Sequence, residues 1–190
     1  MSKPTFEQME ELFAQIHSGF VTRAKLQVFL NGVATPEPEF GNAFLLSIDY
    51  RLTIAQMAAA ARVYSSDINE ATFPHRCEGE VVVTVELMKF EQETETPMAL
   101  ANIGAQGYRP GTMAEMLCLA EQHPNVVRRF PVVALGSVCR DTYGRAYCGH
   151  IHRPFGESIL HVSDYLNKWR EACCFLVVKK TESELQRDMD

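Results

Sequence analysis

Alternation of side chains with a period of two is clearest from Glu80 to Phe90, where Val81, Val83 and Val85 fall on one side of an extended chain. This period is typical of a β-strand that is buried on one face. Shorter apolar runs bounded by turn residues predict four further strands, at residues 44–50, 131–138, 159–162 and 173–179. The part of the chain beyond residue 43 therefore has enough strands for a sheet.

Apolar residues at helical spacing predict the helices. Two amphipathic segments within residues 1–33 predict a helical hairpin, and residues 34–42, which carry Pro36 and Pro38, predict a linker. Thr53 is placed to cap an alanine-rich helix that runs to about Val63. Pro97 suits the first turn of a short helix, for which we expect Gly104 to be the C-cap.

The next helix has the most specific signal. Thr112 and Glu115 have the spacing of a capping box, and Pro124 is expected to end the helix. Its apolar stripe is predicted to face the core and consists of Met113, Met116, Leu117 and Ala120. The order of these elements predicts an α+β domain over residues 43–180, followed by a polar tail at 181–190 that we expect to be disordered.

Composition narrows the class of protein. The 190 residues are 46% hydrophobic and 22% charged, which is ordinary for a soluble globular protein with a real core. The net charge of -6 argues against a nucleic-acid partner, because binding to phosphates needs clustered Lys and Arg. No apolar run approaches the ~18 residues that span a bilayer, and the first residues lack a signal core. We expect a cytoplasmic protein, not bound to membrane, whose six cysteines are reduced.

One group of side chains has the chemistry of a metal ligand set or a Cys–His pair. Alternation along a strand would place Cys148, His150 and His152 on one face, with His161 nearby. There is no Cys-x-x-Cys pair and no oxyanion-hole motif to accompany them. We therefore expect no cofactor, and the alternative to a metal or catalytic role is that these are surface side chains.

The segment from Tyr143 to Trp169 is polar, aromatic and punctuated by glycines, with Tyr143-Gly144 and Gly149 predicted to mark turns. Tyr, Trp, Arg and Asn give binding loops a large contact area and adaptable hydrogen bonds. The alternative is that Trp169 and Phe155 fill the core beneath such a loop. The candidate ligand-binding residues are Tyr147, His150, His152, Arg153, Phe155, Tyr165, Asn167 and Trp169.

Three stretches of the chain carry a resemblance to a known family. They are Arg109-Pro110-Gly111-Thr112 leading to Glu115, the strand Ala134-Leu135-Gly136-Ser137, and the terminal Phe175-Leu176-Val177-Val178-Lys179. Together they resemble C-type-lectin-like domains of bacteria, including the formylglycine-generating-enzyme-like group, over about residues 104–180. A closer likeness, which covers nearly the whole chain, is to short proteins of candidate-phyla bacteria. The metal ligands and paired cysteines of the formylglycine-generating enzymes have no counterpart here.

The resemblance implies a display scaffold. In such proteins the segment before the last strand is often hypervariable, in some cases through diversity-generating retroelements, and it corresponds here to about residues 147–172. We therefore expect non-catalytic binding of a protein or other macromolecule through this segment. Two alternatives stay open: a metal-dependent or Cys/His enzyme that uses Cys148, His150 and His152, and a structural subunit that binds a partner through the N-terminal hairpin.

Overall fold

The computed structural model describes Phe13, residues 43–64, Phe73, residues 78–153 and residues 157–181. The chain divides into two compact units, Met1–Pro36 and Glu37–Asp190, and every element below belongs to the second unit. The expected hairpin at 1–33 lies outside the described residues, apart from Phe13. The whole of the expected linker at 34–42 lies outside them too. Phe155 and the tail from residue 182 lie outside them as well.

The fold is mixed α+β, as the sequence predicts. The described residues form a seven-stranded sheet in which the strands follow the order β1-β2-β9-β5-β6-β7, with β4 pairing β9. The strands of this sheet are β1 (Phe44–Asp49), β2 (Glu80–Lys89), β4 (Tyr108–Pro110), β5 (Val132–Arg140), β6 (Ala146–His152), β7 (Ile159–Asp164) and β9 (Cys174–Lys179). Among the paired strands of this sheet that the structure describes, only β5 and β9 run parallel. A separate ribbon joins β3 (Thr94–Glu95) to β8 (Lys168–Trp169).

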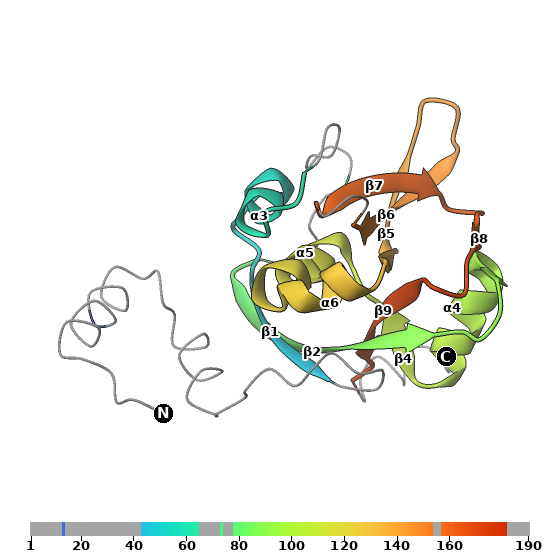
Figure 1. The fold of residues 1–190 in the computed structure, drawn as a ribbon, viewed down its shortest axis with the longest axis horizontal. Coiled ribbons are helices and arrows are strands. Elements are labelled where there is room, and N and C mark those ends of the chain that lie inside the picture. Colours follow the sequence, from blue (N-terminus) through green and yellow to red (C-terminus); the bar gives the residue numbers. More distant parts are fainter. Residues whose placement is uncertain (1–12, 14–42, 65–72, 74–77, 154–156, 182–190) are drawn as a thin grey trace. The chain divides into compact units, whose positions relative to one another are not determined.

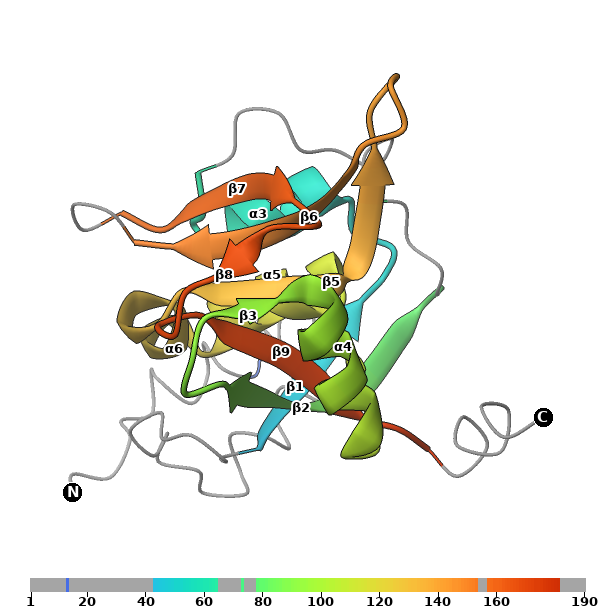
Figure 2. The ribbon, with the colours of Figure 1, turned by 90° about the vertical axis from the view of Figure 1, so that its right-hand side faces the viewer.

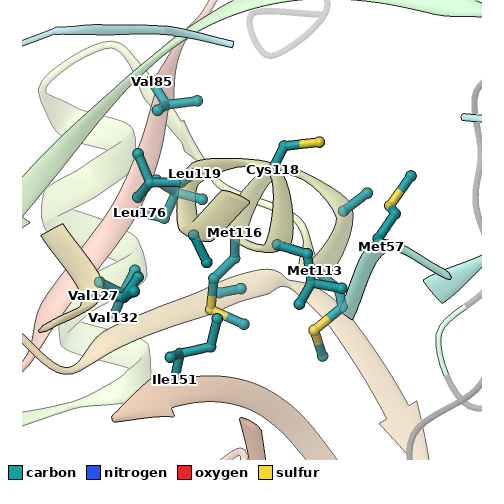
Figure 3. Packing of buried hydrophobic residues seen from close by; sticks show 14 of the residues in the cluster. Met57, Val85, Met113, Met116, Cys118, Leu119, Val127, Val132, Ile151 and Leu176 are labelled. Carbon is teal, nitrogen blue, oxygen red and sulfur yellow. The ribbon is translucent and has the colours of Figure 1, made fainter. Parts of the chain in front are cut away.

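Four helices of the described part cover the sheet. They are α3 (Ile54–Ala60), α4 (Thr96–Ala105), α5 (Met113–Gln122) and α6 (Pro124–Arg129). The sheet curves around α5 and α6, and α3 lies beside α5 on the same side (Figure 1). Every residue of α5 from Met113 to Ala120 is buried, so this helix forms the centre of the larger core, where Met116 and Leu119 pack towards Ile151 and Leu176 (Figure 3). No helix among the described residues is long and apolar enough to cross a bilayer.

The opposite face of the sheet carries a smaller core. Ala99 and Ile103 of α4 pack there with side chains of β5 and β9, together with Cys148 and Trp169. Viewed from that side, α4 and the β3–β8 ribbon lie in front of β5 and β9, while β6 and β7 extend beyond them (Figure 2). One end of this face therefore has less cover than the rest.

The stretches that carry the family resemblance meet at the start of α5. The Thr112 side chain accepts a hydrogen bond from Glu115 N, and the Glu115 carboxylate accepts one from Thr112 N at 2.6 Å, which confirms the predicted capping box. Arg109 donates to both oxygens of that buried carboxylate, at 2.7 and 3.2 Å. Ser137 Oγ accepts from Met113 N at 2.8 Å, so the strand β5 caps the helix from outside.

A bulge in β5 makes this contact fit. The register with β6 shifts between Ala134 and Val138, and Gly136 N donates to Gly111 O at 2.8 Å. A Cβ atom at Gly136 would lie 2.5 Å from Pro110 O, a backbone atom that cannot move aside cheaply. Glycine at this position therefore allows two stretches of backbone to touch.

Several predictions about local structure are corrected. Gly149 is not a turn but lies within β6, where its missing side chain makes room for Met113. Gly104 lies within α4, which ends at Ala105 with Gln106 as its C-cap, and the left-handed φ of 78° belongs to Gly107. Pro124 ends α5 but also begins α6, since proline is tolerated in the first turn of a helix.

Candidate binding surface

Much of the segment from Tyr143 to Trp169 forms a strand pair. β6 and β7 run antiparallel, and their register sets His150 opposite His161 and Cys148 opposite Ser163. Residues that are paired across antiparallel strands point to the same face, as do alternate residues along one strand. Cys148, His150 and His152 therefore share one face, as the sequence predicts, and His161 joins them from the neighbouring strand.

Three imidazole rings stack at the surface end of this face. The ring centroids of His152 and His161 are 4.6 Å apart, those of His150 and His152 are 5.3 Å apart, and those of His150 and His161 are 5.6 Å apart. The interplanar angles lie between 11° and 22°, so the rings are nearly parallel. We call His150, His152 and His161 the histidine ladder. It is half-buried at His150 and His152 and exposed at His161.

Trp169 supports the ladder from beneath. Its side chain is only 3% exposed and donates from Nε1 to Thr96 Oγ1 at 2.8 Å. The indole meets His150 edge-on at 6.0 Å and Phe175 edge-on at 6.2 Å. The expectation that Trp169 is part of an exposed surface is therefore wrong, because β8 carries it into the smaller core.

The environment of the ladder opposes protonation. Burial, and then the neighbouring His152 and His161, lower the pKa of His150 to about 4. Burial and His161 also lower the pKa of His152. Ser163 Oγ lies 3.3 Å from His150 Nδ1, whereas His152 Nδ1 is buried and has no hydrogen-bond partner within the described protein. Both shifts of the pKa favour the uncharged imidazole.

Parallel stacking is a poor arrangement for a metal ion. The lone pair of an imidazole nitrogen lies in the ring plane, so stacked rings direct their lone pairs side by side rather than to one point. Among the described residues, no group of three His, Cys, Asp or Glu side chains is placed to hold an ion.

Cys148 is not placed to act as a nucleophile. Its side chain is completely buried, and burial raises the pKa of the thiol to about 12. The reactive form of cysteine is the thiolate, which this environment disfavours. Cys139, Cys173 and Cys174 are also free thiols whose pKa is raised by burial.

The other candidate residues divide between surface and support. Arg153 and Asn167 are exposed. Tyr165 is half-buried against the smaller core, and burial raises the pKa of its phenol. Tyr147 follows the alternation onto the other face of β6, where its hydroxyl donates to Asp141 Oδ2 at 3.2 Å. The structure thus places His150 and His152 on one face of the strand pair and Tyr147 on the other. Arg153 follows His152 at one end of the pair, and Asn167 lies in the turn beyond the opposite end.

A turn that the sequence reasoning overlooked completes the surface. Between β7 and β8, Asp164 Oδ1 accepts from Leu166 N at 2.9 Å, and Asp164 O accepts from Asn167 N at 3.1 Å. This turn leaves Leu166 72% exposed. Aspartate at the first position of a turn is a recognisable sequence signal, so the turn that begins at Asp164 could have been predicted from the sequence.

Comparison of the chain with protein-family models, with curated proteins and with solved structures finds no match.

Proposed function

We propose that this protein binds another macromolecule, without catalysis, through the exposed side of β6 and β7 and the turn after them. The binding surface consists of His150, His152, Arg153, His161, Leu166 and Asn167. The observation that carries the proposal is the histidine ladder, because it places stacked aromatic rings at a surface on top of a fixed, buried indole.

Preorganisation supports this proposal. Binding is weakened when a surface must be ordered at the moment of contact. Here the register of β6 and β7 fixes the ladder, and the Asp164 turn fixes the backbone of Leu166 and Asn167. Stacked imidazoles, an arginine and an exposed leucine next to an asparagine combine apolar area with hydrogen-bonding groups, as in protein-recognition surfaces.

The finer assignment of the fold is also a proposal: a C-type-lectin-like domain over residues 43–180, preceded by a helical hairpin. It is supported by the contacts among the stretches that carry the resemblance. Arg109, Glu115 and Ser137 are joined at the start of α5, and Leu176 of the last strand packs against Gly111. If the likeness holds, residues 147–172 form the part that varies among relatives, and β6, β7 and β8 display it.

Site-specific photo-crosslinking tests the binding proposal. A photoreactive phenylalanine analogue replaces Leu166 in one preparation and Met98 in another, and each protein is irradiated in lysate from the source cells. Met98 lies on α4 and is 60% exposed, so it is a matched apolar control. We expect a discrete crosslinked product from position 166 that is absent at position 98.

Surface variants make the test specific. The combined substitution of His161, Arg153 and Asn167 by alanine should remove the crosslink at 166 and leave the melting temperature almost unchanged, since exposed changes cost about 0.5 kcal/mol or less each. Equal crosslinking at both positions, or an undiminished product in the triple variant, would count against the proposal.

A further inference from the structure

A polar cavity adjoins the proposed binding surface at Arg153, which belongs to both. It lies where the exit of α3, the last turn of α6 and the residues just before β7 come together. Its volume is about 380 Å³. The lining consists of Arg62, Tyr64, Arg128, Arg153, Glu157 and Ser158. Three guanidinium groups against one carboxylate give the lining an excess of positive charge, although the chain as a whole carries a net charge of -6.

From this cavity we infer a binding site for a small phosphorylated compound, of the sugar-phosphate class. Guanidinium groups match the oxygens of phosphate in bidentate geometry and keep their charge at every physiological pH. The hydroxyls of Ser158 and Tyr64 and the carboxylate of Glu157 offer hydrogen bonds to the hydroxyl groups of such a ligand. The volume lies at the lower end of the range of about 300–1,000 Å³ that small-molecule sites occupy.

The backbone at Arg62 is an independent sign that its side chain has a use. Arg62 has φ of 53° just after α3, and Val63 N donates to Ala58 O at 3.0 Å across it. This is the helix-ending motif in which glycine usually takes the left-handed position, because a side chain there is strained. An arginine is less favourable than glycine for this backbone conformation, but its side chain supplies one of the three positive charges in the cavity wall. Strained residues of this kind cluster at ligand sites.

The wall is also held in place by main-chain hydrogen bonds. Tyr64 N donates to Ser158 O at 3.0 Å, and Leu160 N donates to Tyr64 O at 2.9 Å. These bonds tie the exit of α3 to the start of β7. Arg128 belongs to the last turn of α6, where the partial negative charge of the helix end favours a cation. The charges are thus carried by three separate parts of the fold and brought to one cavity.

Calorimetric titration of the full chain tests the inference, at a fixed ionic strength of about 0.15 M. Ribose 5-phosphate and inorganic phosphate are the probes, ribose is the uncharged control, and a phosphoserine peptide tests the alternative of a phosphorylated protein. We expect saturable binding of ribose 5-phosphate with a Kd of about 1 mM or tighter, weaker binding of phosphate, and no binding of ribose.

The variants separate binding from folding. Arg62→Gly removes one guanidinium and suits the left-handed backbone, so it should fold at least as well as the parent and bind ribose 5-phosphate roughly tenfold more weakly or worse. Arg128→Gln should weaken binding similarly. Arg129→Gln is the matched control, because it changes the same charge on the neighbouring residue, which does not line the cavity.

Three results would overturn the inference: no saturable binding of either phosphate probe, undiminished binding in Arg62→Gly, or equal loss in Arg129→Gln. Tighter binding of the phosphoserine peptide than of ribose 5-phosphate would overturn the assignment to a small molecule. The inference does not depend on the proposed macromolecular binding. Arg153 is shared with that surface, but Arg62 and Arg128 are not, so variants at these two positions test the cavity alone.

Discussion

The start of α5 and the histidine ladder both gather polar side chains beside the same sheet, yet they differ in how those groups are satisfied. At α5, the buried Glu115 accepts from Arg109 and from Thr112 N, and Ser137 accepts from Met113 N. On the ladder, the hydrogen bond between Ser163 and His150 is long, at 3.3 Å, and His152 Nδ1 has no partner within the described protein.

The difference separates a structural task from a binding task. A polar network whose members all have partners fixes one arrangement of the chain, because any other arrangement would leave a buried charge unpaired. Polar groups with few partners inside the protein keep their capacity for a partner outside it. We therefore assign specification of the fold to the α5 network and recognition to the ladder, and three measurements can break or sharpen this contrast.

The largest effect is expected in the core around α5. Leu117 is completely buried, and Leu117→Asp creates a cavity and buries a carboxylate without a partner. We expect this to cost more than about 5 kcal/mol, comparable with the whole stability of a domain, so that no folded protein is obtained. The same substitution at Leu166, which is 72% exposed, should leave the circular dichroism spectrum and melting temperature nearly unchanged. A folded Leu117→Asp protein would show that the helix is misassigned.

A smaller but still large effect is expected at the buried ion pair. Glu115→Ala leaves Arg109 without its carboxylate and Thr112 N without its acceptor, and we expect a loss of about 3 kcal/mol in the free energy of unfolding, measured in urea. The control is Glu80→Ala, which removes an exposed carboxylate from Arg51, whose side chain is 65% exposed. That change should cost less than about 1 kcal/mol. Equal losses in the two variants would remove the distinction between the network and the surface.

The smallest effect concerns pH and the ladder. The unfolded chain takes up a proton at His150 near pH 6.5, whereas the folded chain does so only near pH 4. Between these values the unfolded state binds more protons than the folded state. The contribution of His150 to the free energy of unfolding is therefore complete above pH 6.5 and decreases as the pH is lowered towards 4. We expect His150 to account for about 1–2 kcal/mol of that fall.

The slope identifies the residue. In His150→Asn the free energy of unfolding should fall less steeply between pH 6.5 and 4, whatever its absolute value at pH 8. His123 and His152, whose pKa values burial also lowers, should sustain the remaining slope. An unchanged slope in the variant would mean that His150 is solvated and that the ladder is looser than its ring distances indicate.

Local patterns in the sequence predicted the parts of these regions that depend on neighbours along the chain. Thr112 and Glu115 are three residues apart, so the capping box and the start of α5 follow from their spacing. Alternation likewise placed His150 and His152 on one face. Arg109 belongs to the same short motif, but its bidentate pairing to Glu115 depends on the path of β4 and does not follow from the motif.

Local patterns could not predict how strands and side chains from distant parts of the sequence are paired. That His161 stands opposite His150 depends on the loop that joins β6 to β7, and a shift of one residue would send His161 to the other face. Burial of Trp169 depends on Thr96, which is 73 residues away in sequence. The charged cavity escaped prediction for the same reason, because Arg62, Arg128 and Arg153 belong to three distant segments.

Trp169 has a practical consequence, because it is the only tryptophan among the 190 residues. Its fluorescence is a built-in signal from one known place, the underside of the proposed binding surface, and needs no attached label. Far-UV circular dichroism reports on the helices and strands of the whole domain instead. If both signals change at the same denaturant concentration, the proposed binding surface and the core around α5 unfold as one cooperative unit. If the fluorescence changes at a lower denaturant concentration, the proposed binding surface unfolds locally while the rest of the domain stays folded.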